Sequence, residues 1–144
     1  MCKKVKIERQ FEVNSEILWK ALTDKDEMKK WYFEVENFIP EVGFKFQFWG
    51  ESETRKYLHF CTITVVEDRK RICYSWEYDG IPGTTLVCFE ITPVSLNSSE
   101  LLIVHSGFET FPPEYEELSV ESFEKGWSGI LDTSLKNYLT QKKQ

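Results

Sequence analysis

The stretch EYEELSVESFEKGWSGILDTSLKNYLTQKKQ, residues 114–144, decides how the rest of this 144-residue chain is interpreted. Its apolar residues recur at spacings of three and four, so they share one face of a helix with 3.6 residues per turn. They are Val120, Phe123, Trp127, Ile130, Leu131, Leu135 and Tyr138. The pattern predicts a long terminal helix over residues 114–144 that packs one face on the rest of the chain.

Two glycines, Gly126 and Gly129, lie inside this predicted helix on either side of Trp127. A glycine inside a helix costs about 1 kcal/mol relative to alanine. Its presence here favours a close approach to the helix backbone, and the neighbour is either a packed strand or a bound ligand. The sequence leaves both possibilities open.

The amino-terminal part of the chain predicts one strand followed by two short helices. Residues 4–13 alternate apolar and polar side chains, which is typical of a strand with one solvated face. Asn14 or Ser15 can cap the first helix. Asp24, with Glu27 three residues later, has the form of a capping box and predicts the start of the second.

The middle of the chain predicts an antiparallel sheet, because successive strands are joined by hairpin-length connections. We expect six further strands: a short one ending near Pro40, one opening at Gly43, one over 57–67, one through Tyr74, one through Val87 and one over 100–108. Loops are expected over 50–56 and 93–99. A two-residue turn at Asp68-Arg69 would place Ile63 opposite Tyr74 and Cys61 opposite Trp76.

The predicted fold class is therefore α+β. A curved seven-stranded antiparallel sheet wraps around the long C-terminal helix, with two short helices after strand 1. The length fits a single domain over 1–144, large enough to bury a core without disulfides or a metal, and no cofactor is predicted.

Composition excludes several classes of protein. The formal net charge is −6 and the pI is about 5.1, which argues against nucleic-acid binding because that needs clustered Lys and Arg. No apolar run approaches the length of a membrane span, and the amino terminus has no apolar segment typical of a signal peptide. We therefore expect a cytoplasmic protein.

The four cysteines are Cys2, Cys61, Cys73 and Cys88, and no two of them form a C-x-x-C pair. Most lie in apolar, strand-like runs, where a free cysteine behaves as a small apolar residue. The sequence predicts four free thiols in a reducing compartment and no metal site.

No catalytic constellation is visible in the sequence. The chain has only two His residues and lacks the H-E-x-x-H, phosphate-loop and G-x-S-x-G motifs. His105 shares a strand face with apolar residues and is either a hydrogen-bonded core residue or a polar ligand contact. His59 can lie at a cavity mouth or serve the core. The rings Tyr74, Trp76, Tyr78 and Trp127 are expected to meet between sheet and helix, where they either pack or line a pocket.

With these residues placed, the chain resembles the START-like, helix-grip superfamily that includes the birch pollen allergen. Within it, the chain is similar to the branch named after the activator of heat-shock protein 90 ATPase. The matching stretches, in the family's order, are Glu8-Arg9-x-Phe11-x-Val13, Leu18-Trp19-x-Ala21-Leu22-Thr23-Asp24, Lys30-Trp31, Tyr74-Ser75-Trp76, His105-Ser106-Gly107-Phe108, Gly126-Trp127 and Leu135-x-x-Tyr138-Leu139.

This resemblance implies a cavity between sheet and helix, because most family members bind apolar small molecules or lipids there. Combined with the aromatic inner strand faces, it predicts a non-enzymatic binding site for a hydrophobic ligand. The expected cavity residues are Trp31, Phe46, Phe48, His59, Tyr74, Trp76, Tyr78, His105, Trp127 and Leu131.

Two alternatives remain open at this point. The first is a protein-interaction or co-chaperone module that contacts a chaperone or another protein. Its contact would be the sheet's outer face or the acidic run before and within the terminal helix, made of Glu109, Glu114, Glu116, Glu117, Glu121 and Glu124. In eukaryotic activators this module is the second half of a longer co-chaperone, and 144 residues leave no room for the other half. The second alternative is a cyclase or hydrolase, which some family members have become.

Overall fold

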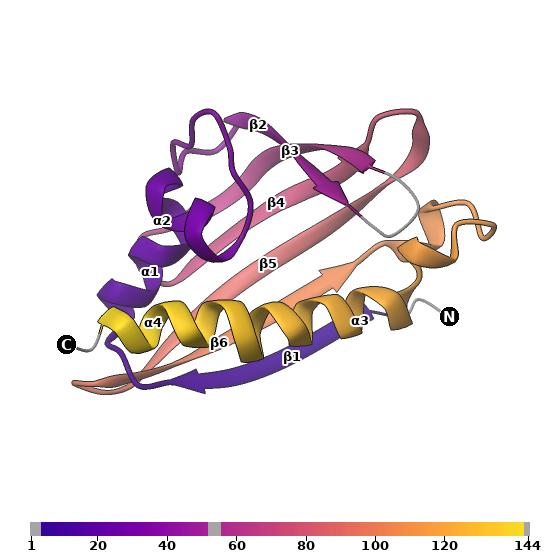
Figure 1. Ribbon diagram of the computed structural model, residues 1–144. Helices are drawn as coiled ribbons and strands as arrows, with labels where there is room; N and C mark the ends of the chain where they lie inside the picture. Colours follow the sequence, from indigo (N-terminus) through magenta and orange to yellow (C-terminus); the bar gives the residue numbers. More distant parts are fainter. Residues whose placement is uncertain (1–3, 52–55, 143–144) are drawn as a thin grey trace.

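The computed structural model describes residues 4–51 and 56–142, and it shows a curved antiparallel sheet with one long helix on its concave face (Figure 1). The elements are β1 (Lys4–Phe11), α1 (Ser15–Thr23), α2 (Lys25–Trp31), β2 (Lys45–Glu51), β3 (Lys56–Glu67), β4 (Arg71–Tyr78), β5 (Ile81–Ser95), β6 (Ser98–Ser106), the 3-10 turns η1 (Phe108–Thr110) and η2 (Glu116–Leu118), α3 (Val120–Gly129), the π segment η3 (Ile130–Leu135) and α4 (Lys136–Lys142). The sheet order is β1-β6-β5-β4-β3-β2. The α+β helix-grip fold that the sequence predicts is confirmed.

The two short helices begin where the sequence predicts them. The Asn14 side chain accepts a hydrogen bond from the Ile17 amide at 2.9 Å, and Asp24 accepts one from the Asp26 amide at 2.9 Å. Each bond satisfies one of the amides that a helix start leaves without a partner. Glu27 makes a contact between helices, because the Tyr138 hydroxyl of α4 donates a hydrogen bond to its carboxylate at 2.7 Å. α2 is thereby joined to the end of the terminal helix.

The β3–β4 hairpin has the predicted register with a different turn. Ile63 lies opposite Tyr74, as expected. Three residues separate Glu67 from Arg71, and the middle one, Arg69, has a φ of 61°. The extra turn residue shifts the pairing next to the turn, and a bulge between Ile63 and Val65 restores it. The inward row that contains His59 therefore keeps its predicted orientation.

The sheet has six strands in the described residues, and the expected strand that ends near Pro40 is absent. Residues 32–44 form no regular ladder, although they bury Val35 and Phe38 in the core. Pro40 has no amide hydrogen to donate to a ladder, and Gly43 adopts a φ of 92°. The expected loop over 93–99 is also wrong, because β5 and β6 continue into it. Residues 52–55 of the other expected loop lie outside the described residues.

The terminal helix starts later than predicted and contains a π segment. It begins at Val120, where the Ser119 side chain accepts from the Ser122 amide at 3.2 Å, so residues 114–119 belong to the preceding connection. α3, η3 and α4 follow one another without a break. A Cβ built on Gly126 or Gly129 would meet no atom within 4 Å, so no strand approaches the helix there. No helix in the described part of the chain is long and apolar enough to cross a membrane.

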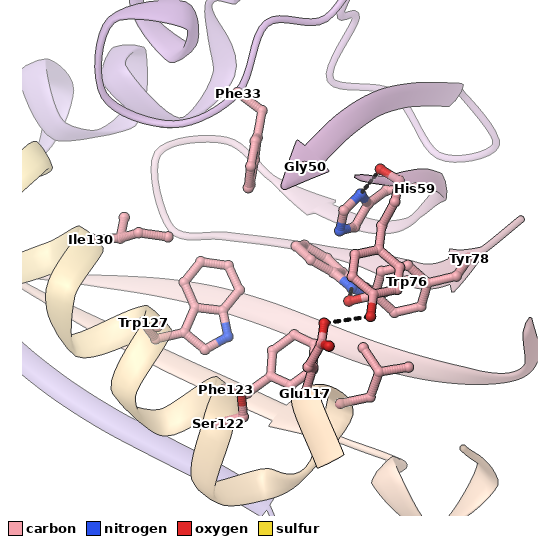
Figure 2. Close-up of a pocket in the computed structure, with 13 residues that line it drawn as sticks. Phe33, Gly50, His59, Trp76, Tyr78, Glu117, Ser122, Phe123, Trp127 and Ile130 are labelled. Carbon is pink, nitrogen blue, oxygen red and sulfur yellow. Dashed lines mark hydrogen bonds between the residues drawn. The ribbon is translucent and has the colours of Figure 1, made fainter. Parts of the chain in front are cut away.

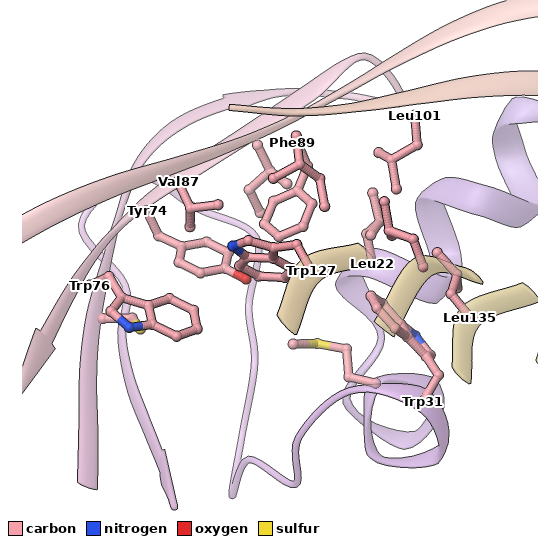
Figure 3. Close-up of a cluster of buried hydrophobic side chains, with 14 of the residues drawn as sticks. Leu22, Trp31, Tyr74, Trp76, Val87, Phe89, Leu101, Trp127 and Leu135 are labelled. Atoms are coloured by element: carbon pink, nitrogen blue, oxygen red, sulfur yellow. The ribbon is translucent and has the colours of Figure 1, made fainter. Parts of the chain in front are cut away.

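The predicted helix stripe forms the centre of the core (Figure 3). Trp127 is 2% exposed, and Leu131 and Leu135 are fully buried, as the spacing predicts. Trp127 packs edge to face on Phe89 of β5, with ring centroids 5.7 Å apart. Burial of this apolar face against the strands holds the helix on the sheet.

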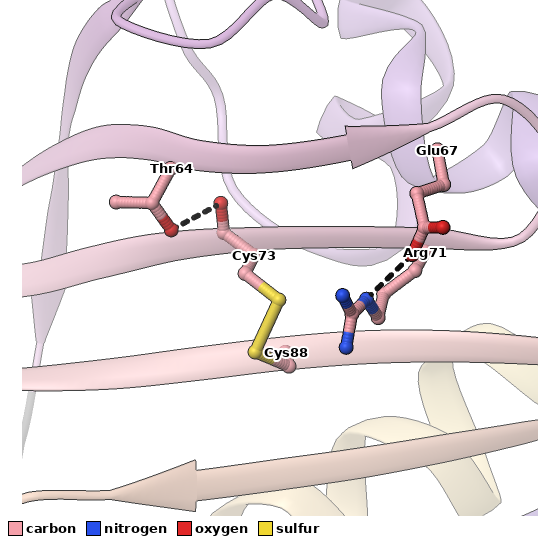
Figure 4. The surroundings of a disulfide bond; sticks show 5 residues. All are labelled: Thr64, Glu67, Arg71, Cys73 and Cys88. Atoms are coloured by element: carbon pink, nitrogen blue, oxygen red, sulfur yellow. Dashed lines mark hydrogen bonds and ion pairs between the residues drawn. A yellow bond between two sulfur atoms is a disulfide. The ribbon is translucent and has the colours of Figure 1, made fainter.

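The structure corrects the prediction of four free thiols. Cys73 on β4 lies directly opposite Cys88 on β5, their Cα atoms are 4.1 Å apart, and the two form a disulfide (Figure 4). The pairing comes from strand register, which the spacing of 15 residues does not reveal. Cys61 is a free, buried thiol, and Cys2 lies outside the described residues. The thiol argument for a cytoplasmic location therefore no longer applies, and that location stays a prediction.

We expect the unreduced protein to weigh two hydrogens less than the reduced protein by intact mass spectrometry. Cys73→Ser should lower the free energy of unfolding by about 3 kcal/mol, the effect of a disulfide that closes a loop of this length. The control is Cys61→Ala, which should leave the mass difference on reduction unchanged. Equal masses before and after reduction would contradict the disulfide.

Candidate ligand cavity

A cavity of about 280 Å³ lies between the first half of the terminal helix and strands β2 to β4 (Figure 2). η2 borders it on one side, and the connection after α2 borders it on another. The lining residues are Phe33, Gly50, Tyr57, His59, Trp76, Tyr78, Glu117, Leu118, Ser122, Phe123, Gly126, Trp127 and Ile130. The lining is therefore mainly aromatic, with a few polar groups among the rings.

The walls of the cavity are rings held edge to face. Trp76 on β4 contacts Trp127 and Phe123 of the helix, with ring centroids 5.8 and 6.1 Å apart. Edge-to-face contacts suit the charge distribution of aromatic rings and fix their orientation. The rings leave an opening between them because they meet at their edges.

His59 on β3 has a fixed orientation in this wall. Its ring stacks on Phe48, with centroids 4.4 Å apart and planes 15° from parallel. Its Nδ1 lies 3.3 Å from the Phe48 carbonyl and 3.2 Å from the Tyr57 carbonyl, so Nδ1 carries the proton and donates. Burial lowers the pKa of His59 to about 4, which keeps the ring neutral at pH 7.

Gly50 on β2 makes room for this imidazole. A Cβ at Gly50 would lie 2.7 Å from Cε1 of His59, closer than van der Waals contact allows. The absence of a side chain therefore lets the ring lie against the backbone of the neighbouring strand. A larger residue at position 50 would displace the imidazole.

Five further polar side chains among the described residues line the cavity. The Trp76 indole nitrogen donates to the Tyr78 hydroxyl at 2.8 Å, and the Tyr57 hydroxyl donates to Glu117 at 2.5 Å. Burial raises the pKa of Tyr78 well above its usual value, so its hydroxyl stays protonated. The Ser122 side chain also lies on the wall. Hydrogen-bonding groups are thus placed around an otherwise apolar space.

His105 lies outside the cavity lining, and both of its ring nitrogens are hydrogen-bonded to other side chains. The Trp127 indole nitrogen donates to its Nδ1 at 3.1 Å, and its Nε2 lies 2.8 Å from the Thr85 hydroxyl. Nδ1 accepts, so Nε2 carries the proton and donates to Thr85, which donates to the Trp76 carbonyl at 3.3 Å. Burial lowers the pKa of His105 to about 3. This arrangement fits the interpretation of His105 as a core residue.

The structure brings four of the ten predicted site residues together at the cavity. These are His59, Trp76, Tyr78 and Trp127. Phe48 contacts His59 and Trp76, and His105 contacts Trp76 and Trp127, although neither lines the cavity. Whether any of them binds a ligand stays a prediction.

The remaining four predicted site residues pack in the core away from the cavity. They are Trp31, Phe46, Tyr74 and Leu131. Trp31 donates to the Ala21 carbonyl at 2.9 Å and joins α2 to α1. The Tyr74 hydroxyl is 2.8 Å from the Tyr32 hydroxyl, so its polar atom is satisfied inside the core. A side chain that points inward can therefore either line the cavity or pack in the core, and its orientation alone does not distinguish the two.

Sequence reasoning missed several cavity residues that carry a usable signal. Tyr57 continues the inward alternation of His59, and Phe123 and Ile130 belong to the helix stripe. Gly126 stands out by its cost to the helix. Glu117 belongs to an acidic run that predicts a solvated surface, and its contact with Tyr57 has no signal in the sequence.

A second hollow, of about 720 Å³, borders the connection before β2. Most of its lining is polar and comes from the outer face of the sheet, including Lys45, Gln47, Thr62 and Glu77. The smaller cavity is the better candidate because it combines apolar walls with a few converging polar groups. Within the described residues, no cluster of three His, Cys, Asp or Glu side chains is suited to a metal ion.

Comparisons with known proteins agree with this architecture. The family model described as Activator of Hsp90 ATPase homolog 1-like protein matches residues 12–140. The chain has no significant match among curated proteins. It is similar to the solved structure of protein MLL2253 from Mesorhizobium loti, with 25% identity, a TM-score of 0.78, and coverage of 96% of this chain and 98% of that one.

Two further solved structures share the fold at lower identity. CalU16 from Micromonospora echinospora is 20% identical, with a TM-score of 0.72 and coverage of 99% of this chain and 79% of that one. DynU16, from the dynemicin biosynthetic locus, is 18% identical, with a TM-score of 0.76 and coverage of 95% of this chain and 47% of that one. The predicted START-like, helix-grip resemblance is confirmed.

Two buried, neutral imidazoles predict a pH dependence of stability. Unfolding returns both His residues to a pKa near 6.5, whereas the folded values are about 4 and about 3. As the pH falls below 6.5, both imidazoles bind protons in the unfolded chain and stay neutral in the folded chain. The free energy of unfolding therefore decreases. Each His should contribute up to about 1.4 kcal/mol per pH unit between pH 6 and pH 4.

Denaturant unfolding between pH 7.5 and pH 4.5 measures this slope. His105→Gln serves as the comparison, since the exposed carboxylates titrate alike in both proteins and their contribution cancels. The variant should be less stable at pH 7.5 and should show a shallower decline on acidification. Identical slopes in the two proteins would show that His105 is not held neutral by the fold.

Proposed function

Because the chain belongs to the Activator of Hsp90 ATPase homolog 1-like family, we propose that it binds a hydrophobic small molecule or lipid in the cavity between sheet and terminal helix. The observation that carries this proposal is a cavity of about 280 Å³ with mainly aromatic walls under the terminal helix. Side chains that pack at close to crystal density leave few such spaces in a domain of this size.

The size of the cavity supports a compact ligand. An engineered apolar cavity of about 150 Å³ binds benzene, so a space of about 280 Å³ suits a two-ring compound or the end of a longer apolar chain. The rings of Phe33, Trp76 and Trp127 supply flat apolar surfaces against which a ligand can pack. Polar groups at a few points would then fix its orientation.

The properties of the polar groups support binding rather than turnover. His59 is the one imidazole on the cavity wall among the described lining residues, and a pKa of about 4 makes it a weak base at neutral pH. The hydrogen bonds of its ring within the described residues go to backbone carbonyls and to no Ser, Thr or Cys side chain. A base without a nucleophile beside it does not support covalent catalysis, so we propose a non-enzymatic site.

A second candidate function has a specific observation in its favour. Trp49 on β2 is 61% exposed, and Phe60 on the neighbouring β3 is 36% exposed. Both lie on the outer face of the sheet near its β2 edge, and exposed apolar residues that gather at one place can mark a protein-interaction site. A co-chaperone or other protein-interaction role would use this surface, and it would not depend on the cavity.

A matched pair of glycine substitutions tests the binding proposal. A Cβ on either Gly126 or Gly129 would have no atom within 4 Å, and only Gly126 lines the cavity. Gly126→Leu should fold and reduce ligand binding, because its side chain would extend beside the cavity. Gly129→Leu should fold and bind normally. Both should gain up to about 1 kcal/mol of helix stability.

A thermal-shift screen of sterols, flavonoids, naphthalenes and fatty acids measures binding in the three proteins. Saturation at about a hundred times the dissociation constant should stabilise the wild type by roughly 2.7 kcal/mol. Native mass spectrometry of freshly purified protein would identify any small molecule already bound. Binding that Gly126→Leu leaves intact would place the ligand elsewhere. The interaction role would be favoured if no compound shifted the melting temperature and if Trp49→Ala lost binding to a protein that the wild type binds.

A further inference from the structure

The chemistry of the cavity wall narrows the class of ligand, on the assumption that the proposed binding function holds. We infer that the cavity selects uncharged ring compounds that donate a hydrogen bond to Nε2 of His59, and that it rejects carboxylates. Three features of the described residues carry this inference: an unused acceptor, an unused donor beside it, and the absence of a cation from the lining.

The unused acceptor is the second ring nitrogen of His59. The side chain is 5% exposed, and its Nδ1 serves both backbone carbonyls within reach. Nε2 has no hydrogen-bond partner among the described residues, and Figure 2 shows that nitrogen turned toward the space between Phe33 and Trp76. Because Nδ1 holds the proton, Nε2 presents a lone pair. An acceptor that faces the cavity and has no protein partner favours a ligand that donates to it.

The unused donor belongs to Tyr78, which pairs with His59 across the β3–β4 ladder. Its oxygen accepts the Trp76 indole hydrogen, and its own hydroxyl hydrogen has no acceptor among the described residues. The His59 and Tyr78 rings lie 4.6 Å apart between centroids. One hydroxyl group on a ligand can therefore donate to His59 and accept from Tyr78, which satisfies both groups at once.

Charge excludes the other common class of apolar ligand. None of the described lining residues is Lys or Arg, and the His59 and Tyr78 side chains are neutral. A fatty acid would bring its carboxylate to a wall on which no described lining residue is a cation. Burying a carboxylate without a cationic partner is strongly unfavourable. The same wall accepts a neutral hydroxyl without this cost.

Three naphthalenes that share one ring system test the inference by isothermal titration calorimetry at pH 7.5. 2-Naphthol offers a hydrogen-bond donor, 2-methoxynaphthalene lacks it, and 2-naphthoate is an anion. We expect 2-naphthol to bind roughly tenfold more tightly than the methoxy compound, the effect of one hydrogen bond to the His59 acceptor. 2-Naphthoate should show no measurable binding.

Two variants locate the preference at the wall. His59→Phe keeps a ring and removes the acceptor, so the ratio of methoxy to naphthol dissociation constants should fall toward one. Where crowding at Gly50 prevents that variant from folding, His59→Leu removes the same acceptor without an aromatic ring and should reduce the same ratio. The control is Tyr74→Phe, which removes a buried hydroxyl outside the cavity and should keep the wild-type ratio.

The outcomes separate this inference from the binding proposal. Binding of all three compounds with similar affinity would overturn the inference and leave the binding function standing. A wild-type ratio that survives removal of the His59 acceptor in a folded variant would overturn it as well. Binding of none of the three by the folded wild type would count against the binding function itself, and the inference would fall with it.

Discussion

The hydrogen bond from the Trp127 indole to Nδ1 of His105 is the constraint on which the packing of helix against sheet depends. An indole has one donor and no acceptor, so its N–H must find a partner when the ring is buried. His105 can accept only while it is neutral with its proton on Nε2, and Thr85 takes that proton's hydrogen bond. Removing any member would leave a buried polar group unpaired, which costs about 1–3 kcal/mol.

Fixing Trp127 in this way divides the space under the terminal helix into two unequal parts. Toward the carboxyl end, Leu131 and Leu135 fill the interior, and the Tyr138 hydroxyl reaches Glu27 on α2. Toward the amino end, the stripe presents rings that meet Trp76 edge to face, and the cavity is the space that these contacts leave open. The cavity therefore follows from where the indole is anchored.

Periodic patterns make most of the fold predictable from the sequence. The helix stripe identifies Trp127 as buried, and alternation identifies the inward faces of β3 and β4. Ile63 lies opposite Tyr74 as predicted because a bulge offsets the extra turn residue. The disulfide is not predictable in the same way, because β4 meets β5 at a register that depends on the length of the turn between them. The expected strand before Pro40 fails for a related reason. An apolar run predicts burial, and a ladder partner has to exist before burial becomes a strand.

The candidate site is less predictable than the fold because lining a cavity is a property of pairs of elements. Trp31 and Trp76 are both buried aromatic residues, yet one joins two helices and the other faces the open space. What separates them is the element opposite, and single-sequence periodicity carries no information on that. The glycine at position 126 is a local signal because glycine is unfavourable inside a helix, but Gly129 carries the same signal and does not line the cavity.

The two histidines show how the residue opposite decides between a structural and a ligand-facing role. Both point inward from one sheet, and burial keeps both neutral. Opposite His105 the helix carries Trp127, whose indole nitrogen donates to the unprotonated Nδ1 of His105. Along the cavity that His59 lines, the helix presents Ser122 and Gly126 beside the rings of Phe123 and Trp127, and no described helix side chain donates to His59. The nitrogen that an indole would otherwise occupy is left open there, so the same residue type that completes the core at position 105 becomes an acceptor for an incoming molecule at position 59.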